Sequence, residues 1–229
     1  MSNNKYLLKG GTIVNEGKIW IADILIEDSL ITKIDTNISH PNAEEINVEG
    51  LHILPGVIDD QVHFREPGLT HKANIESEAK AAVAGGTTSF MEMPNTNPAA
   101  LTQELLQDKY DIASQSSLAN YSFFMGTSND NIEEVLKTNP KNVCGLKIFM
   151  GSSTGNMLVD NEQTLRSLFS RVDMLIAAHC EDEKTVRNNL ELAIEKYGEN
   201  IPANLHPIIR SDEACYLSTD LAFKLAREY

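Results

Sequence analysis

Two histidines in this 229-residue chain each stand at the end of a predicted strand, and imidazole nitrogen is a good ligand for a transition metal. His63 follows residues 57–62, and Gln61 stands two positions before it. Alternate residues of a strand face the same side, so Gln61 and His63 are expected about 6.5 Å apart along one face. His179 follows the apolar residues 175–178. A histidine at the end of a strand is more often structural than ligating, so these residues alone leave both interpretations open.

Three further polar residues have chemistry suited to a metal or a substrate. Lys147 stands in the apolar segment Gly-Leu-Lys-Ile-Phe-Met, where an unpaired ammonium is costly to bury; pairing with a carboxylate or reaching the surface is the ordinary alternative. Arg65 can present a planar, two-pronged donor to a carboxylate. Asn95 lies in the turn-prone segment Met-Pro-Asn-Thr-Asn-Pro, where its amide could do no more than cap the turn.

Alternating strands and helices after Pro55 must position these residues. We expect strands at residues 57–63, 87–93, 119–125, 143–150 and 174–179, and helices at residues 75–84, 102–117, 129–137, 161–170, 181–197 and 212–227. Gly85 suits the end of the first helix, and Ser128 and Asp160 are the expected N-caps of the third and fourth. This alternation predicts an α/β fold with a parallel sheet.

The positions of the polar residues favour one kind of parallel sheet. No GxGxxG or P-loop motif follows any predicted strand, which speaks against an open nucleotide-binding sheet. The polar residues fall instead at the carboxyl ends of strands, where a (β/α)₈ barrel keeps its active site. Five strands and the start of a sixth unit make an incomplete barrel. Since the chain stops inside a helical pattern at Tyr229, we expect it to be part of a longer polypeptide.

The first part of the chain has a different rhythm. Short β-branched runs at residues 6–8, 12–14, 19–27, 30–35, 45–48 and 52–54 are separated by turn signals such as Gly10-Gly11. They predict a small antiparallel β domain over residues 1–54, a β-sandwich layer that precedes a truncated barrel domain over residues 55–229.

Composition excludes several classes of protein. A formal net charge of -14 leaves no basic patch for a nucleic acid. The three cysteines form no CxxC pair, which argues against a disulfide framework. No apolar run is long enough to span a bilayer, and the first residues lack the core of a signal peptide. We therefore expect a cytoplasmic protein with a small-molecule substrate and neither nucleic-acid nor membrane partners.

Four segments together resemble a known family. Residues 55–68, PGVIDDQVHFREPG, are similar to the PGxIDxHxHxRxPG signature of the cyclic-amidohydrolase branch of the amidohydrolase superfamily. EMPNTNP at residues 92–98 makes the resemblance closest to dihydroorotases. GLKIFMG at residues 145–151 and AHCED at residues 178–182 follow in the family's order, so the resemblance covers the whole chain.

The resemblance implies a zinc site of one or two ions. It assigns His63, Lys147 and His179 as ligands, with Lys147 carboxylated by CO₂ so that it bridges two metals. Gln61 stands where the family has the first histidine of HxH. A glutamine carbonyl is a harder and weaker zinc donor, so Gln61 leaves the metal count open. His206 does not match the family's later metal histidine, and we assign it a structural or loop role.

The resemblance also implies the reaction. Arg65 and Asn95 would hold the substrate carboxylate, while the general acid/base aspartate and a further metal histidine are expected beyond residue 229. The implied activity is the reversible cyclisation of N-carbamoyl-L-aspartate to L-dihydroorotate in pyrimidine synthesis, by a homodimer. The alternatives are a hydantoinase, dihydropyrimidinase or allantoinase, or a non-catalytic homologue that supports a partner such as aspartate transcarbamoylase.

Overall fold

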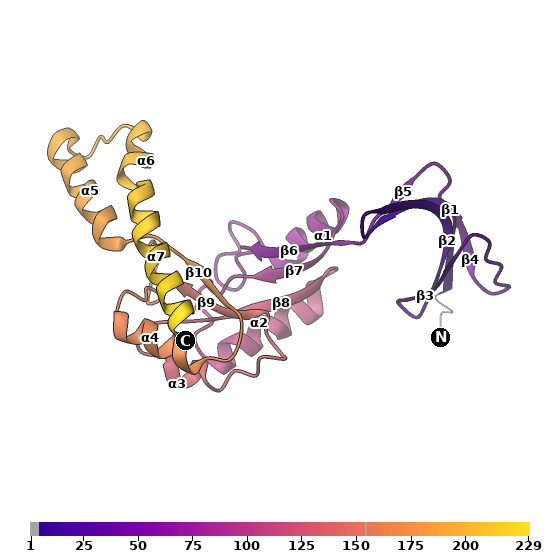
Figure 1. Cartoon of the computed structure of the whole chain (residues 1–229), viewed down its shortest axis with the longest axis horizontal. Helices are drawn as coiled ribbons and strands as arrows, with labels where there is room; N and C mark the ends of the chain where they lie inside the picture. Colours follow the sequence, from indigo (N-terminus) through magenta and orange to yellow (C-terminus); the bar gives the residue numbers. More distant parts are fainter. Residues whose placement is uncertain (1–4, 154) are drawn as a thin grey trace. The chain divides into compact units, whose positions relative to one another are not determined.

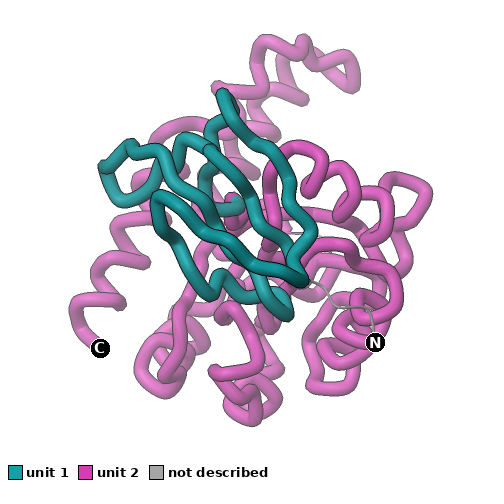
Figure 2. Tube along the Cα trace, turned by 90° about the vertical axis from the view of Figure 1, so that its right-hand side faces the viewer, with its two compact units in different colours: residues 1–56 teal, residues 57–229 magenta. Residues whose placement is uncertain are grey.

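The computed structural model describes residues 5–153 and 155–229. Contacts divide the chain into two compact units, residues 1–56 and residues 57–229 (Figure 2). Each unit has hydrophobic clusters of its own, so each is described by itself. Among the described residues, no helix combines the length and the apolar character needed to cross a membrane.

The first unit contains one five-stranded sheet. Its strands are β1 (Lys5–Asn15), β2 (Lys18–Glu27), β3 (Leu30–Asp35), β4 (Glu44–Asn47) and β5 (His52–Ile53). β1, β2 and β3 form an antiparallel meander, but β4 and β5 pair with β1 in parallel. The expected antiparallel pairing was therefore wrong for β4 and β5, and the described part of this unit forms a single mixed sheet.

Gly10-Gly11 is the second correction in this unit, because it lies within β1 and does not form a turn. The pairing with β2 shifts register between Leu8 and Gly11, and Gly10 has a φ of +72°. A glycine in the left-handed region lets a strand absorb an extra residue as a bulge. Gly11 in turn lies so close to β5 that an added Cβ would be 2.4 Å from Ile53 Cδ1.

The second unit is built on a five-stranded parallel sheet. Its strands are β6 (Val57–Val62), β7 (Thr87–Glu92), β8 (Asn120–Gly126), β9 (Gly145–Phe149) and β10 (Ile176–His179). They lie side by side in the order of the sequence, as Figure 1 shows. A doubly wound sheet reverses its strand order near the middle, whereas the strands of a (β/α)₈ barrel follow one another in sequence. The sheet therefore has the topology of a partial barrel, as predicted.

Helices alternate with these strands, and the last three helices follow β10. They are α1 (Ile75–Ala84), α2 (Gln103–Ser116), α3 (Ile132–Val135), α4 (Glu162–Arg171), α5 (Glu183–Tyr197), α6 (His206–Ile209) and α7 (Asp212–Glu228), with a 3₁₀ turn at Ala203–Leu205. α1 packs on β7 and α2 on β8. The main core lies between the sheet and these helices, and includes a cluster of aromatic rings from Phe64, Phe90, Tyr110, Tyr121 and Phe123.

The predicted helices are present, but some of their ends differ. α3 is a single turn within the expected residues 129–137, and α6 and the 3₁₀ turn were not predicted. The N-caps are Asn131 and Asn161, not Ser128 and Asp160. The Asn161 side chain accepts hydrogen bonds from two first-turn amides, those of Gln163 and Thr164. Serine, aspartate and asparagine are all favourable N-cap residues, so the sequence does not show which of several nearby polar residues caps the helix. The path of the backbone decides it.

Candidate metal centre

His63 directly follows β6 and forms a hydrogen bond with Asn95. Its Nδ1 lies 3.0 Å from Asn95 Oδ1. Since the amide oxygen can only accept, this hydrogen bond requires the tautomer with the proton on Nδ1, which leaves a lone pair on Nε2. Burial, together with the positive charge of Arg65, lowers the pKa of His63. His63 is thus held neutral and oriented, as a metal-ligating histidine must be.

Lys147 lies in the middle of β9 with only 4% of its surface exposed. Within the described part of the chain, no hydrogen bond or ion pair is found for its amine; Nζ lies 5.0 Å from the centre of the Phe149 ring. Burial lowers the pKa of Lys147. No carboxylate pairs with this lysine among the described residues, and burial shifts its amine toward the neutral form that reacts with CO₂.

His179 ends β10, next to β9, and is oriented by a carboxylate that the sequence prediction missed. Its Nε2 lies 2.8 Å from Glu181 Oε2, and in the neutral imidazole that donates this hydrogen bond the lone pair is on Nδ1. Arg210 binds both oxygens of Glu181, with Nε 2.7 Å from Oε1. The hydrogen bond from Arg210 lowers the pKa of Glu181 to about 2, which keeps the carboxylate ionised. Arg210 comes from the segment after α5, where we had singled out only His206.

The other predicted site residues are Gln61, Arg65 and Asn95. Gln61 is exposed and lies in the stretch between Asp59 and Val62 where β6 changes register against β7. Arg65 has a φ of +69°, and its charge acts on His63. Asn95 binds His63, a contact that we did not predict. Asn95 also lines a cavity of about 470 Å³.

These residues meet part of what zinc requires. Two imidazoles each have one nitrogen engaged and one lone pair available, and a carboxylated Lys147 would add an oxygen ligand. Among the residues that the structure describes, no group of three or more His, Cys, Asp and Glu side chains could hold a metal. The set fits zinc once the lysine is modified, and further ligands would have to join it. His206 is exposed at the start of α6, outside this set.

Comparison with solved structures places the fold in one class. The chain superposes on L-hydantoinase (dihydropyrimidinase) from Arthrobacter aurescens with a TM-score of 0.89 and 22% identity, covering 99% of this chain and 51% of that one. D-Hydantoinase (dihydropyrimidinase) from a Thermus species gives a TM-score of 0.79 and 27% identity over 97% of this chain and 50% of that one. The fold is that of the first half of a barrel amidohydrolase.

Sequence comparison then identifies the family. The model of the family described as dihydro-orotase-like matches residues 50–201, and the chain belongs to this family. It is 33% identical to an allantoinase from Deinococcus radiodurans, over 82% of this chain and 43% of the relative, and 33% identical to a dihydroorotase from Bacillus cereus, over 79% and 43%. A dihydroorotase from Lactococcus lactis is 44% identical over 49% of this chain and 27% of the relative. The family prediction is confirmed, and the chain spans about half the length of these relatives or less.

Proposed function

We propose that this chain forms the N-terminal half of a zinc-dependent cyclic amidohydrolase whose substrate pair is N-carbamoyl-L-aspartate and L-dihydroorotate. The observation that carries the amidohydrolase assignment is the unpaired amine of Lys147, a residue only 4% exposed. Lys147 lies on β9, in the same sheet whose strands β6 and β10 lead to two oriented imidazoles. A buried lysine without a partner is costly as an ammonium but well suited to form a carbamate.

Each residue has a distinct role in this proposal. His63 Nε2, His179 Nδ1 and the carbamate of Lys147 would hold the metal. When bound, zinc polarises the amide carbonyl and lowers the pKa of a water molecule. Asn95 keeps His63 in its ligating tautomer, while Glu181, fixed by Arg210, does the same for His179. Arg65 would bind the carboxylate of the substrate through paired hydrogen bonds.

Arg65 is the residue that favours dihydroorotate over other rings. A carboxylate distinguishes dihydroorotate from hydantoins and dihydropyrimidines, and a guanidinium matches its geometry. Allantoinase remains the second candidate, because the Deinococcus relative is as similar to this chain as the Bacillus dihydroorotase. Activity of the full-length protein toward dihydroorotate, hydantoin, dihydrouracil and allantoin decides between them. We expect the highest kcat/KM for dihydroorotate; a preference for allantoin would contradict the choice of ring.

We further propose that catalysis needs residues supplied outside this chain, since the described donor set is incomplete without them. The isolated 229 residues are expected to show no turnover of dihydroorotate, while the full-length protein does. Turnover by the isolated chain would overturn this part of the proposal.

Gln61 motivates a rival proposal from another class, a non-catalytic homologue that supports a partner enzyme such as aspartate transcarbamoylase. The metal content of the full-length protein separates the two. We expect one or two zinc ions per chain and a homodimer on sedimentation. A protein without zinc that co-purifies with aspartate transcarbamoylase would favour the rival.

A further inference from the structure

Glu92 and Lys109 form a buried ion pair that the candidate metal centre does not use. Glu92 ends β7 and is 0% exposed, and Lys109 on α2 is 1% exposed. Lys109 Nζ lies 2.8 Å from Glu92 Oε2. Removing two charges from water costs several kcal/mol per ion, and apolar pairs of the same size are often as stable or more so. Stability alone therefore does not account for this pair.

The contacts of Glu92 point to the chain segment that leaves β6. Its Oε1 accepts a hydrogen bond of 3.1 Å from the Phe64 amide. Burial raises the pKa of Glu92, while Lys109 and the backbone of Phe64 and Arg65 oppose this rise. Phe64 and Arg65 are the two residues that follow His63. Arg65 has a φ of +69°, a conformation that costs a non-glycine residue free energy and persists only where its surroundings hold it.

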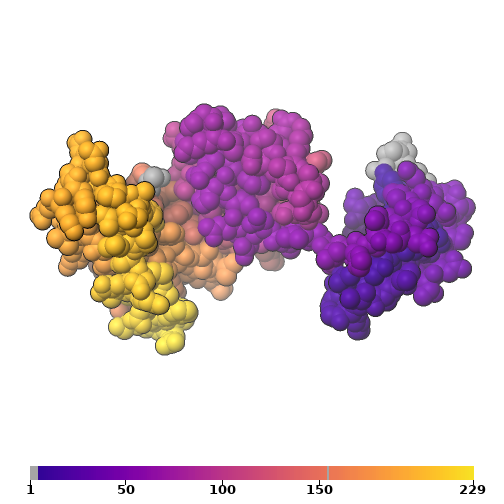
Figure 3. Space-filling view, turned by 90° about the horizontal axis from the view of Figure 1, so that it is seen from above, coloured from indigo at the N-terminus to yellow at the C-terminus, as the bar shows by residue number. Residues whose placement is uncertain are grey.

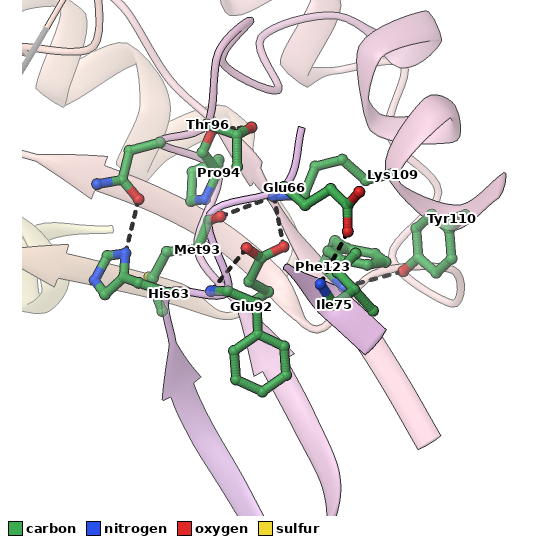
Figure 4. A network of polar contacts seen from close by, with 12 residues as sticks. His63, Glu66, Ile75, Glu92, Met93, Pro94, Thr96, Lys109, Tyr110 and Phe123 are labelled. Carbon is green, nitrogen blue, oxygen red and sulfur yellow. Dashed lines mark hydrogen bonds and ion pairs between the residues drawn. The ribbon is translucent and has the colours of Figure 1, made fainter. Parts of the chain in front are cut away.

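Lys109 completes the arrangement from the other side. Besides Glu92, its ammonium donates a hydrogen bond of 2.9 Å to the Met93 carbonyl and lies 5.0 Å from the centre of the Phe123 ring. The Met93 amide in turn donates to the Val62 carbonyl. Figure 4 shows Glu92 and Met93 beside Lys109, with Glu92 also bonded to the backbone next to His63. Glu92 and Lys109 thus connect the segments that follow β6 and β7. His63 lies in the first of these segments and Asn95 in the second, and the two side chains form a hydrogen bond.

We infer that Glu92, neutralised by Lys109, is a positioning residue: its carboxylate fixes the backbone turn that presents His63 to the metal and Arg65 to the substrate carboxylate. A carboxylate suits this role because both of its oxygens accept, so Oε1 can receive the Phe64 amide while Oε2 faces Lys109. Lys109 provides the one partner found for Oε2 in the described residues. The inference rests on the proposed function for the identity of the ligands it positions.

Two double variants of the full-length protein distinguish a positioning role of Glu92 from a general contribution to folding stability. E92Q/K109M removes both charges but keeps an oxygen that can accept from the Phe64 amide. E92L/K109M also removes both charges and leaves no acceptor. We expect the Phe64 amide to exchange with solvent about tenfold faster or more in E92L/K109M than in E92Q/K109M, because its acceptor is lost. Zinc affinity should fall about 10–100-fold in E92L/K109M and by a few-fold at most in E92Q/K109M, as for other groups that orient ligands.

Leu168→Ala is the matched control for destabilisation. Leu168 on α4 is fully buried in the main core and is not part of the site. This variant should lower the melting temperature without changing Phe64 exchange at low temperature, zinc affinity or KM. Equal exchange and equal zinc affinity in the two double variants would overturn the inference, as would faster exchange in E92L/K109M with unchanged zinc affinity and KM.

The same readouts distinguish failure of the inference from failure of the proposed function. Wild-type protein that binds zinc but turns over no ring contradicts the proposed function, and exchange and zinc affinity then decide the inference. Wild-type protein that binds no zinc overturns the role of His63 in both. If E92L/K109M does not fold, Glu92→Asp is tested in its place. The shorter side chain withdraws its carboxylate from the Phe64 amide but keeps its charge opposite Lys109. Unchanged Phe64 exchange and unchanged zinc affinity in this variant would overturn the inference.

Discussion

At the scale of single residues, two buried lysines show how surroundings decide chemistry. Burial lowers the pKa of both Lys109 and Lys147. Lys109 faces Glu92 at 2.8 Å, which favours its charged form, whereas the amine of Lys147 has a ring beside it and no carboxylate partner among the described residues. A paired ammonium is unreactive, while a neutral amine can attack CO₂. The sequence shows only two lysines; their difference comes from their neighbours.

Lys147→Met is expected to abolish the carbamate and to lower both zinc content and kcat, the latter by about 100-fold or more, because an oriented ligand is lost. Carbon-13 NMR after exposure to labelled CO₂ should show a carbamate signal in the wild type and none in the variant. Lys80→Met, at an exposed lysine paired with Glu76, should change neither quantity. Clear density for an unmodified Lys147 amine with zinc bound would contradict the prediction.

Arg65→Met tests the choice of ring. A hydrogen-bonded guanidinium contributes about 1.5–3 kcal/mol to binding a charged group, so KM for dihydroorotate should rise about 10- to 150-fold. The KM for hydantoin, which has no carboxylate, should be unchanged, and steady-state kinetics on the full-length protein measure both. Arg171→Met, at an exposed arginine paired with Glu133, serves as the control. Equal effects on both rings would show that Arg65 does not bind the carboxylate.

At the scale of elements, the bulge in β1 depends on a carboxylate from the neighbouring strand. Asp23 in β2 is buried and accepts hydrogen bonds from the Gly10 and Ile38 amides and from Lys9. Burial by itself raises the pKa of Asp23, but the hydrogen bonds from Lys9 and the two amides outweigh it and lower the pKa. The irregular backbone at Gly10 thus has a polar partner within the same unit.

Asp23→Asn is therefore expected to destabilise the first unit by about 1.5–3 kcal/mol at pH 7. Because the folded pKa is depressed, the contribution of Asp23 is complete above the unfolded pKa of about 3.9 and is lost as pH falls through the lower folded value. The single tryptophan, Trp20 in β2, reports unfolding of this unit by its fluorescence in urea. Wild type and variant should differ at pH 7 and converge toward pH 3; a constant difference would contradict the assigned role.

Local sequence signals predicted where helices, strands and turns lie better than how the strands pair. Gly85 ends α1 as expected, and a tight turn separates the expected runs at residues 12–14 and 19–27, with Glu16 and Gly17 both at positive φ. The parallel pairing of β4 was not predicted, since strand direction depends on how a connection folds back and leaves no local pattern. The N-caps were misplaced by a few residues for a similar reason, because several neighbouring polar side chains could serve.

At the scale of the whole molecule, the parallel sheet of the second unit has two open edges. In the described residues, β6 pairs only with β7, and β10 only with β9. Large apolar side chains are exposed at both edges, with Ile58 at 61% and Leu175 at 65%. Figure 3 shows the surface of this unit in space-filling form. Unpaired strand edges with exposed apolar residues promote pairing with other chains.

We therefore expect the isolated 229-residue chain to self-associate as its concentration rises, and Ile58→Lys to reduce this by placing a charge on the edge of β6. Sedimentation at several concentrations gives the mean mass of each protein. Leu192→Lys, at an exposed position on α5 away from the sheet edges, is the control and should have a smaller effect. An equal reduction by both variants would assign self-association to apolar surface in general.

The sequence by itself determined the strand–helix order, the tight turns, the family and the residues at the strand ends, because these depend on local periodicity, on turn-forming residues or on short motifs. Tertiary structure alone decided which side chains meet. Asn95 binds His63 from 32 residues away and Arg210 binds Glu181 from 29 residues away, and the Glu92–Lys109 pair joins a strand to a helix. A buried polar group takes whichever partner the folded backbone brings within hydrogen-bonding distance, and that choice leaves no pattern in the sequence.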